Sequence, residues 1–112
     1  MRFGLLNSVT EMGPVGPVAL SYSATITLTV TEGNTFTLTS TGNCTINASG
    51  TQVTGQEITV LILNDGSLPR TVTFGTGFKA AATVIGTVNK MAALKFVSDG
   101  TNLYELCRTL GL

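Results

Sequence analysis

The sequence predicts an all-β protein of short antiparallel strands, preceded by an extended N-terminal arm. The composition is rich in Thr, whose branched side chain favours strands, and in Gly, which occurs 13 times and suits tight turns. Apolar and polar residues alternate with the two-residue period of a strand in several short segments. The chain has 112 residues, of which 11% are charged. This length predicts one small domain, and the weakly charged surface favours an oligomer.

Residues 1–22 are predicted to form the arm, and residues 23–112 the folded domain. Pro14 and Pro17 lack the backbone N–H that a helix or a central strand requires. Burying the apolar side chains of the arm gains roughly 12–24 kcal/mol, whereas ordering its backbone costs on the order of 20–40 kcal/mol. We therefore expect the arm to be ordered on a partner, with a disordered leader as the alternative. The expected partner-binding residues are Phe3, Leu5, Leu6, Val9, Met12, Val15, Val18 and Leu20.

Three alternating segments follow the arm. Apolar residues alternate with Thr over residues 24–31 and 35–39, and with Thr and Asn over residues 44–48. Turn sequences separate these segments at residues 32–34 and 42–43. Strands that are joined by short turns and have one polar side predict a hairpin-linked meander in an antiparallel sheet.

The next part of the chain predicts a central strand. Residues 57–63 have apolar side chains along one side and, at Leu61 and Leu63, on the other side as well. Apolar residues on both sides are typical of a strand in the middle of a sheet. Residues 70–74 return after a turn, and the glycine pair in residues 75–78 predicts a bulge or a corner between sheets.

The strongest hairpin signal lies near the C-terminus. Asp99-Gly100 separates two apolar segments at residues 95–97 and 103–106, and Asp-Gly favours the two-residue turn of a β-hairpin. With the small-residue segment at 80–85, the chain is predicted to contain seven to nine short strands.

The composition excludes most catalytic and metal chemistry. No His is present, so the commonest general base and metal ligand is missing. The carboxylates lie mostly in or beside predicted turns, and no Lys forms a recognisable Ser–Lys motif. The G-x-G-x-x-A pattern at residues 75–80 lacks the following helix that dinucleotide binding requires. We expect no enzymatic activity, no cofactor and no metal.

The cysteine spacing and the net charge argue against further kinds of site and binding partner. Cys44 and Cys107 are too far apart in the sequence for a zinc knuckle or a redox pair. We expect two small buried hydrophobic residues, with a bridge between distant strands as the alternative. The net charge of zero argues against binding to nucleic acid or to an anionic membrane. No segment has the length of a signal peptide core or a membrane span, so assembly inside a cell is expected.

Three segments carry a resemblance to a known family. Residues 55–66 (GQEITVLILNDG), 70–78 (RTVTFGTGF) and 95–105 (KFVSDGTNLYE) resemble the β-rich structural modules of tailed-bacteriophage virions. Such modules occur in capsid decoration (cement) proteins and in tail fibres or spikes, commonly as trimers of jelly-roll-like β-sandwich domains. The resemblance covers about residues 24–109 and implies an antiparallel, jelly-roll-like β-sandwich without catalytic residues.

The resemblance and the arm together imply a function. We expect a homotrimeric capsid decoration protein, because a short module with an arm fits this role better than a long fibre does. It would be assembled in the host cytoplasm and bind the major capsid protein on the capsid surface, tying neighbouring subunits together. The alternative is a trimeric tail-fibre or spike module that binds a receptor or glycan, for which Tyr22 and Tyr104 are candidate contacts. A bacterial surface adhesion module is disfavoured, because we find no secretion signal.

Overall fold

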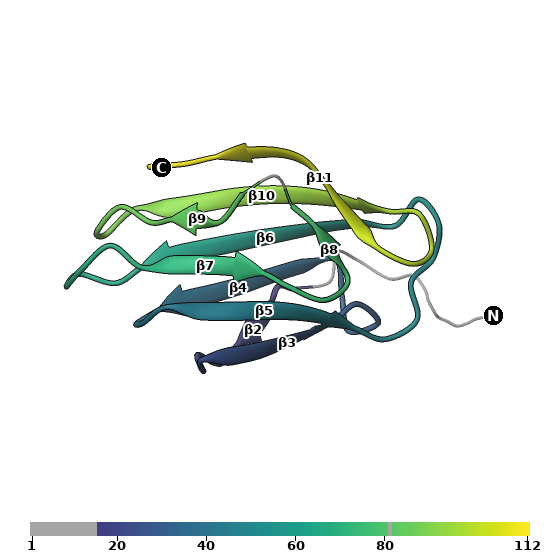
Figure 1. Cartoon of the computed structure of the whole chain (residues 1–112), viewed down its shortest axis with the longest axis horizontal. Coiled ribbons are helices and arrows are strands. Elements are labelled where there is room, and N and C mark those ends of the chain that lie inside the picture. Colours follow the sequence, from purple (N-terminus) through teal and green to yellow (C-terminus); the bar gives the residue numbers. More distant parts are fainter. Residues whose placement is uncertain (1–15, 81) are drawn as a thin grey trace.

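The fold is all-β, as the sequence predicts. The computed structural model describes residues 16–80 and 82–112, which form ten strands in two sheets and no helix (Figure 1). The larger sheet has the order β2 (Val18–Leu20), β4 (Thr35–Ser40), β6 (Glu57–Asn64), β10 (Met91–Ser98), β11 (Leu103–Thr109) and β8 (Phe78–Lys79). The smaller sheet has the order β3 (Thr25–Thr29), β5 (Cys44–Ser49), β7 (Thr71–Phe74) and β9 (Val84–Ile85).

The first half of the chain winds as parallel coils. Successive strands from β2 to β7 alternate between the sheets, so that β2, β4 and β6 are parallel neighbours in one sheet and β3, β5 and β7 in the other. Parallel neighbours need a crossover connection, and here the crossover is the strand in the opposite sheet. This winding is that of a short β-solenoid, so the expected antiparallel, jelly-roll-like meander is wrong for these strands.

The physical reason for this difference lies in the turns. Alternating apolar and polar residues bury one side of a strand whether its neighbour is parallel or antiparallel. Each short turn here carries the chain across the core to the facing sheet instead of back beside the same strand. Thr25 therefore lies beside Thr45, one coil later, and not beside a residue of β4.

The C-terminal part is mainly antiparallel, as predicted, apart from the short parallel pair of β8 with β11. β10 pairs antiparallel with β6 on one side and with β11 on the other, which confirms the hairpin and the central position of β6. The carboxylate of Asp99 accepts hydrogen bonds from the backbone N–H groups of Thr101 and Asn102, at 2.9 and 2.8 Å. Gly100 has a φ of 99°, which favours glycine. These contacts hold the turn between β10 and β11.

The predicted corner at residues 75–78 is also present. It carries the chain from β7 in the smaller sheet to β8 in the larger sheet. Gly77 has a φ of 85°, and the side chain of Asn47 accepts a hydrogen bond from the N–H of Thr76 at 2.8 Å. The glycine pair thus accompanies a change of sheet.

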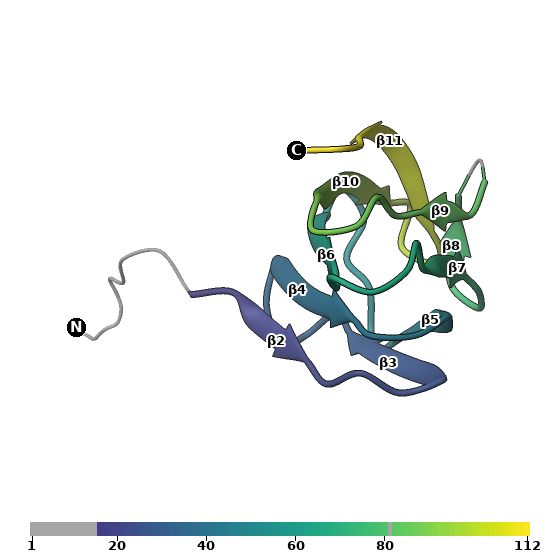
Figure 2. The same ribbon diagram turned by 90° about the vertical axis from the view of Figure 1, so that its left-hand side faces the viewer.

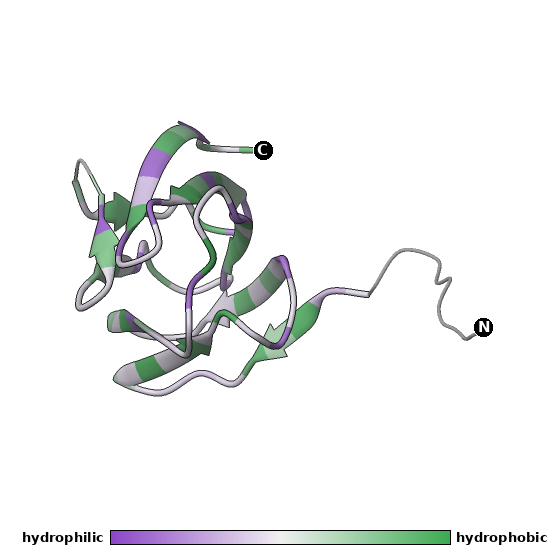
Figure 3. Cartoon of the chain, turned by 90° about the vertical axis from the view of Figure 1, so that its right-hand side faces the viewer, coloured by the Kyte–Doolittle hydropathy of each residue, from purple (hydrophilic) through white to green (hydrophobic). Residues whose placement is uncertain are grey.

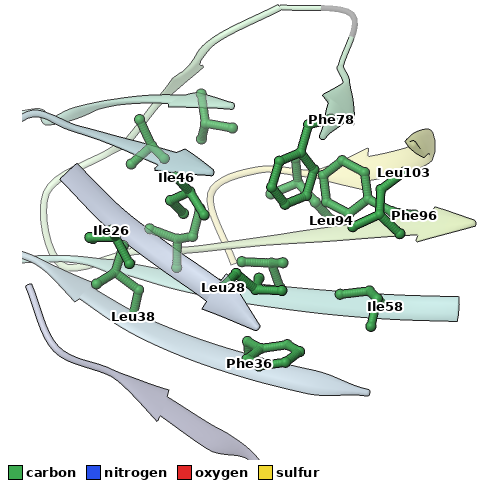
Figure 4. Packing of buried hydrophobic residues seen from close by; sticks show 14 of the residues in the cluster. Ile26, Leu28, Phe36, Leu38, Ile46, Ile58, Phe78, Leu94, Phe96 and Leu103 are labelled. Carbon is green, nitrogen blue, oxygen red and sulfur yellow. The ribbon is translucent and has the colours of Figure 1, made fainter. Parts of the chain in front are cut away.

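The core lies between the two sheets and contains one side of every long strand. Figure 3 shows hydrophobic residues alternating with neutral or polar ones along the strands, and Figure 4 shows side chains from both sheets meeting in the interior. Three aromatic rings pack together at one end, with centroids 4.9–5.1 Å apart, and they belong to Phe74, Phe78 and Phe96. Further residues of the core are Ile26, Leu28, Phe36, Leu38, Ile46, Ile58, Val60, Leu94 and Leu103.

The two cysteines have different environments. Both thiols are free, so the alternative of a bridge between distant strands is wrong. Cys44 is buried in the core, as expected, and burial raises the pKa of its thiol. Cys107 is exposed, contrary to the prediction, because a β-bulge between Lys95 and Phe96 shifts the register of β11.

A buried amide fixes the turn that follows β6. The side chain of Asn64 donates to the carbonyl groups of Asp65 and Leu68, at 3.0 and 2.7 Å, and accepts from the N–H of Arg70 at 2.7 Å. The guanidinium of Arg70 also binds both carboxylate oxygens of Asp65, at 3.0 and 3.1 Å. Hydrogen bonding to Arg70 is the main reason that the pKa of Asp65 is lowered. This turn holds the end of the central strand in place.

The aromatic cluster generates a first prediction. Replacing Phe96 with Ala removes a fully buried ring and its contacts with two others, and should lower the free energy of unfolding by about 3–5 kcal/mol. Urea denaturation followed by circular dichroism measures this change. Val53→Ala is the control, because Val53 is 65% exposed and its truncation should change stability by less than about 0.5 kcal/mol. Equal effects of the two substitutions would contradict the placement of this core.

Two turn carboxylates generate a second prediction. The pKa of Asp65 is lowered mainly by Arg70, and that of Asp99 mainly by the N–H groups of Asn102 and Thr101. Unfolding restores the ordinary value of 3.8, so below about pH 5 the unfolded chain binds more protons than the folded protein. The thermal unfolding midpoint should therefore fall as the pH decreases from about 5 towards 2. Asp65→Asn and Asp99→Asn should each make this decrease shallower, and a slope that neither variant changes would contradict the assignment.

Candidate interaction surface

An apolar patch lies on the outer face of the larger sheet. Leu63 is paired with Met91, and Leu61 with Ala93, across the β6–β10 ladder. Leu112 exchanges two backbone hydrogen bonds with Met91, at 2.9 and 3.0 Å, and directly opposed residues share a face of the sheet. We call these five residues the β6–β10 patch. Leu63 is 37% exposed and Leu112 is 60% exposed, and the other three are partly exposed.

The architecture explains why this face is open. The smaller sheet covers only the inner face of β6, where Ile58, Val60 and Ile62 are buried. In the part of the chain that the structure describes, no second layer covers the outer face. The apolar residues Leu61 and Leu63 predicted a central strand. Because only one face of this sheet is covered, the same two residues also form part of an exposed apolar surface. Sequence reasoning did not include Met91, Ala93 or Leu112 in such a surface.

Polar residues border the patch. Thr37 and Thr39 of β4 lie beside Leu61 and Leu63. Towards the other end of the same face, Lys95 of β10 forms a 3.0 Å ion pair with Glu57 of β6. Hydrogen bonding to Glu57 is the main reason that the pKa of Lys95 is raised. An apolar centre with a polar rim is the usual composition of a protein–protein interface.

The patch stands on rigid elements. β6 and β10 are the two middle strands of the six-stranded sheet, each paired along its length on both sides. The hydrogen bonds of Asn64 and the Arg70–Asp65 pair fix the chain directly after Leu63. Less conformational entropy is lost when such a preformed surface meets a partner than when a flexible segment does, which lowers the cost of association.

The expected arm residues fall into two groups. Val18 and Leu20 belong to β2, which pairs in parallel with β4, and both side chains pack against the margin of the chain's own core. β2 thus lies within the range that the sequence assigns to the arm. The other expected partner-binding residues lie outside the described residues, and they are Phe3, Leu5, Leu6, Val9, Met12 and Val15.

Tyr22 and Tyr104, the candidate glycan contacts, lie at opposite ends of the molecule. The hydroxyl of Tyr22 donates to the carbonyl of Asn43, in the turn after β4, at 2.9 Å. Tyr104 stands beside Val97 near the β10–β11 turn, and a hydrogen bond with Asp99 raises its pKa. The two rings therefore form no common platform.

Other features offer little chemistry. A shallow hollow of about 380 Å³ lies at the β3–β4 and β5–β6 connections, and the side chain of Gln56 at its wall donates to the carbonyl of Val30 at 2.9 Å. Within residues 16–80 and 82–112, no group of three Cys, Asp or Glu side chains is arranged to hold a metal ion. The same residues include no helix long and apolar enough to cross a membrane.

No protein-family model matches the chain, and neither a curated protein nor a solved structure matches it significantly.

Proposed function

We propose that this protein is a structural module of a virus particle, a homotrimeric capsid decoration protein that binds the major capsid protein on the outer surface of the shell. The β6–β10 patch is the observation that carries the self-association, because it presents apolar side chains on a rigid sheet with a polar rim. The resemblance of residues 55–66, 70–78 and 95–105 to tailed-phage modules supports the location in a virion.

In the proposed trimer, each copy turns its larger sheet towards the three-fold axis. The patch then forms the dry centre of the interface, where each fully buried Leu or Met side chain contributes about 1.5–3 kcal/mol. The flanking Thr residues of β4 and the Lys95–Glu57 pair lie at the rim and select the orientation.

The proposed mechanism of shell stabilisation is mechanical. The apolar side chains between Phe3 and Val15 dock on neighbouring capsid subunits, and three such segments per trimer act together. Once one segment is bound, the others dock at a high effective concentration, so that weak single contacts give tight binding. Tying several subunits to one trimer resists the outward pressure of packaged nucleic acid.

A trimeric tail-fibre or spike module that binds a receptor or glycan is the second candidate. The parallel winding of β2 to β7 favours it, because stacked coils extend along one axis as fibres do. The copy number and position in the particle separate the two candidates. A decoration protein covers the shell in many copies, whereas a fibre module is confined to the tail.

A charge in the patch should break the trimer. Leu63→Glu places a carboxylate in the centre of the proposed interface, and desolvating that charge should reduce trimer affinity by a factor of about 100 or more. Native mass spectrometry of the purified chain over a dilution series measures this loss. Leu68→Glu is the matched control, because Leu68 is 59% exposed in the turn after β6 and lies outside the patch. A trimer that survives Leu63→Glu, or a wild-type monomer, would contradict the proposed interface.

Removing residues 1–15 should abolish binding to the shell without unfolding the domain. This boundary keeps β2, which belongs to the larger sheet. Cosedimentation with capsids stripped of the protein measures binding, and circular dichroism with native mass spectrometry verifies that the fold and the trimer remain. Unchanged capsid binding would contradict the role of this segment. Antibody labelling of intact virions confined to the tail would favour the second candidate.

A further inference from the structure

The first coil of the solenoid ends in two open strand edges. β2 is the outermost strand of the larger sheet and β3 that of the smaller sheet, and among the described residues nothing pairs with their outer edges. Figure 2 shows both strands at one end of the molecule, away from β8, β9 and β11. Neither strand contains a charged residue or a proline. Proteins usually protect exposed edges with such residues, so these edges are suited to pairing with another strand.

The hydrogen bonds of β3 show which of its backbone groups are free. The carbonyl of Ala24 accepts from Thr45, at 3.0 Å, and the N–H of Val30 donates to Ser49, at 2.9 Å. In a parallel pair, alternate residues of a strand direct both backbone groups to the same neighbour. The even-numbered residues therefore face β5. The N–H groups of Thr25, Thr27 and Thr29 and the carbonyl groups of Thr25 and Thr27 point to the open edge, whereas the carbonyl of Thr29 accepts from the N–H of Glu32 at 3.0 Å.

The sequence of β3 keeps its alternation of Thr and aliphatic residues when it is read in reverse. Its five residues are Thr-Ile-Thr-Leu-Thr, with the Thr side chains outward and Ile26 and Leu28 buried. Antiparallel pairing about Thr27 sets Thr25 beside the partner's Thr29 and Ile26 beside the partner's Leu28. Apolar residues then meet apolar residues on the inner side, and Thr meets Thr on the outer side, which is a favourable cross-strand pair.

The sequence of β2 also keeps its pattern when it is read in reverse. Its residues Val18-Ala19-Leu20 match in reverse about Ala19. Ala19 lies beside Thr37 of β4, and Thr27 lies beside Asn47 of β5. Thr37 and Asn47 are equally distant from the β4–β5 turn, so Ala19 and Thr27 lie at similar levels along the strands of the two sheets. One two-fold axis can therefore pass through the centre of both edges.

We propose that two copies of this chain join end to end through these edges, so that both sheets continue from one copy into the other about a two-fold axis. Head-to-tail stacking does not fit, because the far ends of the sheets are the two-residue strands β8 and β9. The guanidinium of Arg108 closes that end by donating to the carbonyl groups of Ala82 and Thr83, at 2.7 and 3.1 Å. An open edge of five residues finds an equal partner only in the same edge of a second copy.

This interface is distinct from the β6–β10 patch and does not depend on the proposed virion function. The patch lies on the outer face of the larger sheet, whereas the end-to-end interface uses the edges of β2 and β3. Association through both surfaces would pair two trimers. Substitutions in one surface should leave association through the other intact, so the failure of either proposal is visible by itself.

A proline at the centre of the edge tests the pairing. Thr27→Pro removes an N–H that β5 does not use, and proline is tolerated at such edge positions. It should weaken end-to-end association about tenfold or more, as measured by native mass spectrometry in the Leu63→Glu background, where the patch is blocked. Thr27→Val is the matched control, because it keeps the N–H and the strand preference and should leave association unchanged. Equal association of the two variants would overturn the proposal.

Amide hydrogen exchange provides a second test. It is measured on the Leu63→Glu variant, with Thr27 unchanged. The N–H groups of Thr25, Thr27 and Thr29 should exchange more slowly as the protein concentration rises, because a second copy covers them. Protection that does not change with concentration would show that the edge is covered from within the chain. Fast exchange at every concentration would show an open edge. Either result would overturn the proposal.

Discussion

The structure depends on one constraint: each turn between β2 and β7 moves the chain to the opposite sheet. Each of these strands therefore has a parallel neighbour one coil away in the sequence and its packing partner in the facing sheet. The apolar side of each strand points between the layers, and the long strands of both sheets contribute to a single core. Because a two-layer protein covers only one face of each sheet, the outer faces display whatever the alternate positions contain. On β3 and β5 of the smaller sheet these positions hold Thr, Asn and Ser, and on the larger sheet they include the β6–β10 patch.

The strands themselves were predictable from the sequence, whereas their neighbours were not. Alternation marked β3, β4, β5 and β6 within a residue or two, because a half-buried strand has the same period in any sheet. The Asp99-Gly100 turn predicted its hairpin because its geometry is local, and the glycine pair before Phe78 predicted a corner for the same reason. The turns near Gly33 and Gly42 suit a hairpin as well as a crossing to the other layer. Only the packing of whole strands decides between these outcomes, and that information is not local.

The candidate surface was predictable only in part. Leu61 and Leu63 stand out in the sequence because they break the alternation of β6. Met91 and Ala93 join them through the pairing of β6 with β10, which are separated by about thirty residues of chain. Leu112, beyond the end of β11, joins through its backbone hydrogen bonds with Met91. The edges of β2 and β3 could not be recognised at all without the sheet order, because a strand sequence does not state whether both of its sides are paired.

The parallel winding also governs how the length of this protein can vary. Val18 pairs with Phe36 in the first coil, whereas Thr35 pairs with Thr59 in the second. The second coil is longer because β4 and β5 exceed β2 and β3 in length and because its connection at residues 50–56 is longer than the one at residues 30–34. Insertions or deletions within a strand would move its inward side chains outward. Related genes should therefore differ either in such connections or by the duplication of an entire coil, which would lengthen the molecule by one layer of strands while preserving both ends.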